Sequence, residues 1–146
     1  MSGPQARKAA EWLTRLGMSP RVAGERVGQA SAIKLTRSIM IKGMEALFAE
    51  CFLAARLGGV EDEVLASPEA SDPDIAWRRR RGYAMDRMTV HGRGRAAEMR
   101  EAAVMVAELG LPNAMAAAAQ WQQRLGDLPV KTDDIGVVLK APGGAG

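Results

Sequence analysis

The sequence predicts an all-α protein, a multi-helix domain built round one long central helix. Alanine, leucine, methionine and glutamate abound, whereas aromatic residues make up only 4% of the chain, and this balance favours helices over sheets. Residues 28–57 contain no proline, and shorter segments with helical apolar spacing follow them. With 146 residues, 47% of them hydrophobic, the chain is long enough for one domain with a sizeable core.

The central helix is expected over residues 31–57, a length of roughly 40 Å at about 1.5 Å per residue. Its first half is amphipathic, because Lys34, Ser38, Lys42 and Glu45 recur at spacings of four and three and therefore share one polar face. Its second half, after Gly43, is apolar nearly all round, which is typical of a buried helix. We expect Lys34 near the exposed N-terminal end and the second half buried.

The segments before the central helix read as a helix and a short strand. Pro4 suits the first turn of a helix, whose apolar stripe ends at Gly17. That stripe consists of Ala6, Ala9, Ala10, Leu13 and Leu16. Residues 21–23 then suggest a short extended piece, which has no partner strand in this chain.

Several shorter helices are expected after the central one. The pattern predicts a helix starting at residue 60, a turn between Pro68 and Pro73, and a helix capped by Ser71 or Asp72 that runs through the four arginines 78–81. Further helices are expected over 83–90, 93–109 and 113–125. From residue 129 the pattern fades, so residues 129–146 are expected to form a flexible tail.

Composition limits the function classes. The net charge of +3 permits anion binding but does not require nucleic acid, and no aromatic residues interleave with the basic ones. The single cysteine, Cys51, lies in the apolar run and is expected to be a core thiol in a reducing compartment. No signal peptide or membrane span is evident, so a cytoplasmic protein that binds no membrane is expected.

The order and spacing of several residues resemble the β-hydroxyacid dehydrogenases, the class that includes 6-phosphogluconate and 3-hydroxyisobutyrate dehydrogenases. Gly28, Lys34, Gly43, Leu47 and Glu50 resemble the interdomain helix of that family. The segment HGRGRAAEMREAA resembles the basic-then-Glu-Met helix of a less-characterised branch with an all-helical C-terminal domain. The resemblance covers residues 2 to about 128.

This resemblance implies roles for particular residues. Lys34 matches the catalytic lysine, and Ser38 stands where the family usually has asparagine. Ser2 and Gly3 resemble the turn that holds the substrate carboxylate. Ile41 occupies a position that is acidic in 6-phosphogluconate dehydrogenases, which argues against a sugar-phosphate substrate.

The resemblance also implies a domain organisation. Residues 1–27 would be the end of a dinucleotide-binding domain whose remainder would precede Met1, and residues 28–128 would form the helical substrate-binding and dimerisation domain. The complete enzyme would use NAD or NADP, neither of which this chain holds alone. A small carboxylate-bearing substrate and a homodimer are expected.

Chemically, a lysine that is partly desolvated beside a hydroxy acid can exchange the alcohol proton, because burial lowers its pKa. A lone lysine on a helix is otherwise usually a solvated group. Arg93 and Arg95, at the start of a predicted helix, suit a phosphate or carboxylate, although most charge runs are solvated surfaces. His91, the only histidine, is expected to cap or pack, with a substrate-facing role as the alternative.

Residues 92–97 formally fit the G-x-G-x-x-A dinucleotide turn. That motif needs a buried strand before it and a second strand after it. Neither is predicted here, so the glycines are expected to form a turn between two helices.

Two functional hypotheses follow. The chain is the substrate-binding and dimerising part of an NAD(P)-dependent oxidoreductase acting on a hydroxy acid or related carbonyl compound, and is not catalytically competent alone. The alternative is a stand-alone helical interaction module that binds a partner or an anion through its basic face.

Overall fold

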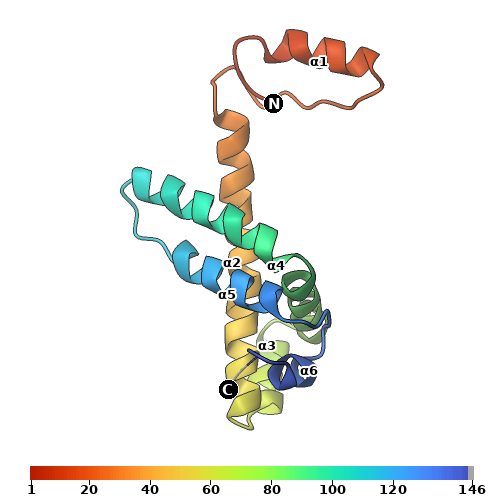
Figure 1. Ribbon diagram of the computed structural model, residues 1–146, viewed down its shortest axis with the longest axis vertical. Helices are drawn as coiled ribbons and strands as arrows, with labels where there is room; N and C mark the ends of the chain where they lie inside the picture. The colour runs from red at the N-terminus through yellow and green to blue at the C-terminus, as the bar shows by residue number, and fades with distance from the viewer. Residues whose placement is uncertain (145–146) are drawn as a thin grey trace.

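The computed structural model describes residues 1–144, which form six α-helices and no β-strand. This confirms the predicted all-α class. The helices are α1 (Ala6–Arg15), α2 (Gln29–Leu57), α3 (Glu61–Ser71), α4 (Trp77–Glu108), α5 (Met115–Asp127) and α6 (Ile135–Lys140). Figure 1 shows α2 as the long axis of the molecule, with α4 and α5 crossing it and α3 and α6 near its C-terminal end.

Helix α2 packs against the neighbouring helices along one face only. Its buried residues are Ser38, Lys42, Gly43, Glu45, Ala46, Ala49, Phe52, Leu53 and Ala55, which recur every three or four positions. The expectation that the second half is buried on all sides was therefore wrong. Leu47 is 67% exposed, and Cys51 is an exposed thiol and not the core thiol we expected.

Helix α3 continues through the first of the two prolines that were expected to bracket a turn. Pro68 lies inside it, at a position where its missing N–H removes one helical hydrogen bond without ending the helix. The backbone N–H of Asp72 still donates to the Pro68 carbonyl at 2.9 Å. The turn therefore falls after Ser71, where the Asp72 carbonyl accepts from Trp77 Nε1 at 3.1 Å, and the next helix begins at Trp77.

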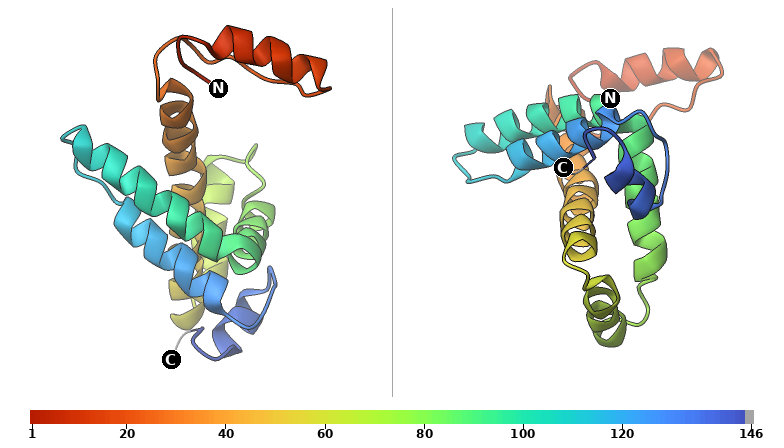
Figure 2. Two further views of the ribbon diagram at one scale, coloured as in Figure 1. Left: turned by 45° about the horizontal axis from the view of Figure 1, so that its top comes forward. Right: turned by 60° about the horizontal axis from the view of Figure 1, so that its bottom comes forward.

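Helix α4 is one continuous helix of 32 residues, where the sequence predicted three. The predicted helix–helix turn at residues 92–94 is wrong, because Gly92 and Gly94 lie within α4. The helix does bend there: Figure 2 shows the ribbon of α4 changing direction as it turns from green to teal, after which it lies beside α5. At the crossing, a Cβ added to Gly92 would lie 2.7 Å from the Cα of Gly126, so only glycine fits at this contact.

The main core lies between α2, α4, α5 and α6. Fully buried members include Met85, Met88 and Leu125. Helix α6 corrects the expectation of a flexible tail after residue 129: the Asp134 carboxylate caps its first turn by accepting from Gly136 N at 2.7 Å. Val138 is then buried in the core. A six-residue helix is too short to show a clear apolar period in the sequence. Residues 145 and 146 of the predicted tail lie outside the described residues.

The N-terminal segment stands apart from the helical body. Figures 1 and 2 both show α1 beyond the start of α2, away from the other helices. Of its predicted apolar stripe only Ala6 is buried, and Leu16 is 76% exposed. The extended piece predicted over residues 21–23 is not a strand; a single parallel β-bridge joins Ser2 to Gly24 instead.

Candidate functional site

The polar face of α2 runs from solvent into the helical body. Lys34 is exposed, whereas Ser38, Lys42 and Glu45 are at most 8% exposed. Sequence periodicity placed these four residues on one face, and the structure confirms that they share it. The sequence periodicity did not show that α4 and α5 would cover most of that face.

The buried part of this face is held by charged hydrogen bonds to α4. The Lys42 ammonium donates to Ser38 Oγ at 3.3 Å and forms an ion pair with Glu98. The Ser38 hydroxyl, which the resemblance assigns to substrate, is thus already in contact with a second lysine. The sequence placed Lys42 on the polar face of this helix but assigned it no role, and it gave no sign that Glu98 would be its partner.

A second ion pair lies one turn further along α2. The Arg95 guanidinium pairs with Glu45, and both side chains are at most 10% exposed. Gln122 Nε2 of α5 donates to Glu45 Oε2 at 3.2 Å and to the Lys42 carbonyl at 3.3 Å. Arg95, predicted to bind substrate, therefore also ties α2 to α4 in the fold.

Burial lowers the pKa of the Lys42 ammonium below its ordinary 10.5, and the nearby positive charges of Arg95 and Lys34 lower it further, while Glu45 acts in the opposite direction. Because the folded state binds this proton less tightly than the unfolded chain, stability should rise with pH up to about 10.5. The charge on Lys42 therefore lowers the free energy of unfolding at neutral pH.

We predict that Lys42→Met flattens this pH dependence. Urea unfolding of both proteins between neutral pH and 10.5 would measure it, since every other titrating group is shared. The wild type should gain stability relative to the variant as pH rises. Parallel curves would contradict the lowered pKa.

The Ser2–Gly3 turn lies against the first turn of α2. The backbone N–H of Ala30 donates to Ser2 Oγ at 2.9 Å, and Gly3 N donates to the Gly24 carbonyl at 3.1 Å. Gly3 has a φ of +133°, which favours glycine. Ala30 lies one turn before Lys34 on α2, so the structure brings the two predicted substrate elements to the same end of that helix.

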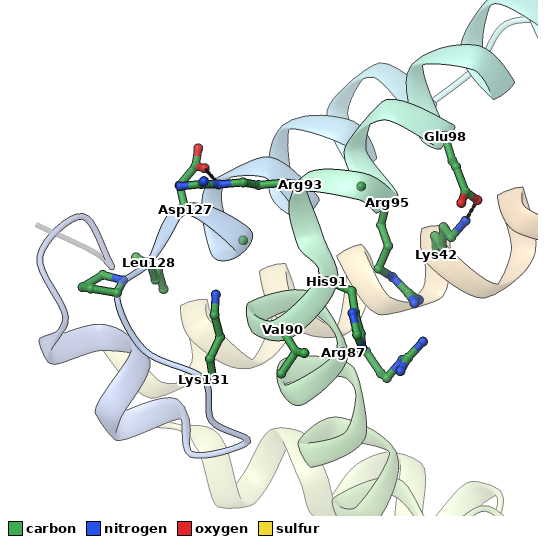
Figure 3. A pocket seen from close by; sticks show the side chains of 13 residues that line it. Lys42, Arg87, Val90, His91, Arg93, Arg95, Glu98, Asp127, Leu128 and Lys131 are labelled. Carbon is green, nitrogen blue, oxygen red and sulfur yellow. Dashed lines mark hydrogen bonds and ion pairs between the residues drawn. The ribbon is translucent and has the colours of Figure 1, made fainter.

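A basic depression of about 990 Å³ opens between α2, the bend of α4 and the segment after α5 (Figure 3). Its charged lining residues are Lys42, Arg87, His91, Arg93, Arg95, Glu98, Asp127 and Lys131. On its rim, Arg93 Nε pairs with Asp127 Oδ1 at 2.6 Å. A hydrogen bond from Gln123, together with this pair, lowers the pKa of Asp127.

The predicted site residues therefore fall into two groups. Arg93 and Arg95 line the depression together with His91, whereas Ser2, Gly3, Lys34 and Ser38 do not. The sequence did not single out Lys131, which reaches the depression from a segment expected to be flexible. Arg87 had no sequence signal beyond being one of the many arginines between residues 78 and 100.

The described residues do not fit a dinucleotide cofactor. Residues 92–97 lie inside α4 and cannot form a phosphate turn after a strand. Within residues 1–144, no cluster of histidine, cysteine and carboxylate groups is arranged to hold a metal ion. None of the described helices is long and apolar enough to cross a bilayer.

The structure is an all-α domain built on one long helix, with a lysine near the exposed start of that helix. This is the class of helical domain that the sequence resembled. Comparison with known proteins gives the family. Residues 55–125 match the family model described as Domain of unknown function (DUF1932). The chain therefore carries a DUF1932 domain, the C-terminal helical domain of 3-hydroxyacid dehydrogenase-like proteins, which confirms the resemblance.

Solved structures similar to this chain include two conserved proteins. A conserved hypothetical protein from Sinorhizobium meliloti 1021 is 36% identical with a TM-score of 0.79, over 91% of this chain and 46% of its own. The conserved protein MTH1747, of unknown function and described as structurally similar to 3-hydroxyacid dehydrogenases, is 32% identical with a TM-score of 0.68, over 86% of this chain and 48% of its own. The chain thus spans about half the length of each. Among curated proteins, no sequence matches it.

Proposed function

We propose that this chain is the substrate-binding and dimerising portion of an NAD(P)-dependent oxidoreductase that acts on a hydroxy acid or a related carbonyl compound. The observation that carries the proposal is that Lys34, exposed on the first turns of α2, lies one turn after Ala30, whose backbone N–H donates to Ser2. The half-length match to 3-hydroxyacid dehydrogenase-like proteins supports it. NAD or NADP would supply or accept the hydride from a separate dinucleotide-binding domain.

Each residue then has a chemical role. Lys34 moves the alcohol proton as general acid or base. Ser38 lies one turn further on, where its hydroxyl can hydrogen-bond the same oxygen. The backbone N–H of Ser2 holds the substrate carboxylate, because the Ser2 hydroxyl already accepts from Ala30 N and Gly3 N already donates to the Gly24 carbonyl.

Joining the chain to a cofactor domain tests this function. The isolated chain should oxidise no detectable NAD(P)H with any hydroxy acid or carbonyl compound, because its described residues form no strand-to-helix phosphate turn for a dinucleotide. A dinucleotide-binding domain of the β-hydroxyacid dehydrogenase type, fused ahead of Met1, should restore activity with at least one small carboxylate-bearing substrate. A folded fusion that binds NAD(P)H but reduces no such compound would contradict the proposal.

The dimer has support on the surface of α2. Ile33, Met40, Met44 and Leu47 are 36–67% exposed and follow one another at spacings of seven, four and three, so they lie along one side of α2, with Arg37 at the position between the first two. This side faces away from the packed helices, so a second copy of the chain is the partner that would cover it. Met85, Met88 and Met99 of α4 do not contribute to such a surface, because they are already fully buried within the chain.

We predict that Leu47→Glu weakens the dimer by roughly thirtyfold or more, the effect of about 2 kcal/mol at a buried apolar contact. Analytical ultracentrifugation over a concentration series would measure the dissociation constant. Val104→Glu, at an equally accessible apolar site on α4 (59% exposed), is the matched control and should leave it unchanged. A wild-type chain that sediments as a monomer at all concentrations would exclude the dimer.

A further inference from the structure

The basic depression carries positive charge that the chain itself does not neutralise. Three of its cations are paired with carboxylates: Lys42 with Glu98, Arg95 with Glu45 and Arg93 with Asp127. The remaining two, Arg87 and Lys131, form no ion pair with any residue between 1 and 144. Lys131 only donates to the backbone carbonyl of Thr89. Two uncompensated charges therefore lie in one concave site.

The arginines of the depression also have unused donors. A guanidinium carries five N–H groups, and Nε of both Arg87 and Arg95 is buried without an acceptor in the described part of the chain. Arg95 is 8% exposed and uses one terminal nitrogen on Glu45. Buried donors are nearly always satisfied in folded proteins, so an acceptor from outside the chain is expected here.

Three of the donors lie on one side of α4. Arg87, His91 and Arg95 are spaced four residues apart on α4, and Figure 3 shows their side chains on the same side of the bent helix. Lys131 enters from the segment after α5. A ligand beside these three residues would meet two guanidinium groups and an imidazole group, whereas Lys131 lies on the other side of α4 in this view.

We propose that this depression is a binding site for a phosphate group. A phosphate dianion matches the two uncompensated charges, and its several oxygens can accept from donors that approach from different directions. A single carboxylate carries half that charge and has fewer acceptors. The site goes beyond the proposed oxidoreductase function, because Lys34, Ser2, Gly3 and Ser38 do not line it.

Titration of the full 146-residue chain with inorganic phosphate, followed by amide NMR shifts, tests the site. Ionic strength is held constant with chloride so that screening does not change. We expect saturable shifts near the α4 bend and the segment after α5. Arg87→Gln should weaken binding by about tenfold or more, because it removes a charge-assisted contact, whereas Lys131→Gln should weaken it less, because it removes a more distant charge from the same depression.

Arg80→Gln is the matched control. It removes the same charge from an exposed position on α4 that does not line the depression, and should change phosphate affinity by less than about twofold. Equal weakening by all three variants would show general charge attraction and overturn the site, as would unsaturable shifts.

Two further ligands define the chemistry. The first is a phosphate monoester such as glycerol phosphate. If it binds more tightly than inorganic phosphate, the ligand is an esterified phosphate; if it binds more weakly, the ligand is free phosphate. Both outcomes support a phosphate site. Acetate that binds as tightly as phosphate would overturn the assignment to phosphate.

Discussion

Gly92→Ala is expected to lower the free energy of unfolding by about 3 kcal/mol, because added volume at a tight contact forces the backbone apart. The new methyl group would lie 2.7 Å from the Cα and the N of Gly126 and still closer to the Gln122 carbonyl oxygen. These neighbours are backbone atoms of α5, which cannot turn aside as a flexible side chain would. Urea unfolding measures the loss.

Gly94→Ala, two residues further along the same helix, is the matched control and should have the opposite sign. A Cβ at Gly94 meets no atom within 4 Å, and alanine is favoured over glycine inside a helix by roughly 0.5–1 kcal/mol. Destabilisation of similar size by both substitutions would show that the effect comes from the bend itself and not from the contact with Gly126.

This pair of glycines also shows what local sequence signals cannot provide. Gly92 and Gly94 look alike in the sequence, and both suggested a turn between helices. The distinction depends on Gly126, a residue of another helix, which Gly92 approaches too closely for a side chain. A contact between distant segments leaves no local pattern.

The central helix could be predicted nearly to its ends, from 31–57 in the sequence to Gln29–Leu57 in the structure, because a long proline-free segment has few alternatives. Its buried face was harder to predict. The apolar Leu47 is exposed while Lys42 and Glu45 are buried, since their partners Glu98 and Arg95 lie on α4. A buried charge is tolerated only where such a partner exists, and sequence spacing does not reveal it.

The candidate site was predicted in part. Spacing alone placed Lys34, Ser38 and Lys42 on one face of α2, but the catalytic role of Lys34 came from the resemblance to the β-hydroxyacid dehydrogenases. The roles of Ser2, Gly3, Arg93 and Arg95 toward substrate remain predictions. The depression could not be predicted, because its lysine at 131 belongs to a segment without a recognisable pattern.

Lys34→Ala should lower kcat of the chain joined to a cofactor domain by about 10²–10⁴, the usual contribution of a general acid or base. The lysine is exposed in this chain, so its replacement should leave folding intact, and circular dichroism would check this. Lys140→Ala removes an exposed lysine from α6, far along the sequence from the proposed site, and should leave kcat unchanged.

Hydride transfer in a single turnover tests the central claim most directly. The joined protein is loaded with NAD(P)H and mixed with its carbonyl substrate, so that the rate reports the chemical step and not product release. The proposed role of Lys34 predicts that Lys34→Ala slows this step by at least about a hundredfold while NAD(P)H still binds normally. Hydride transfer at the same rate with and without Lys34 would contradict it.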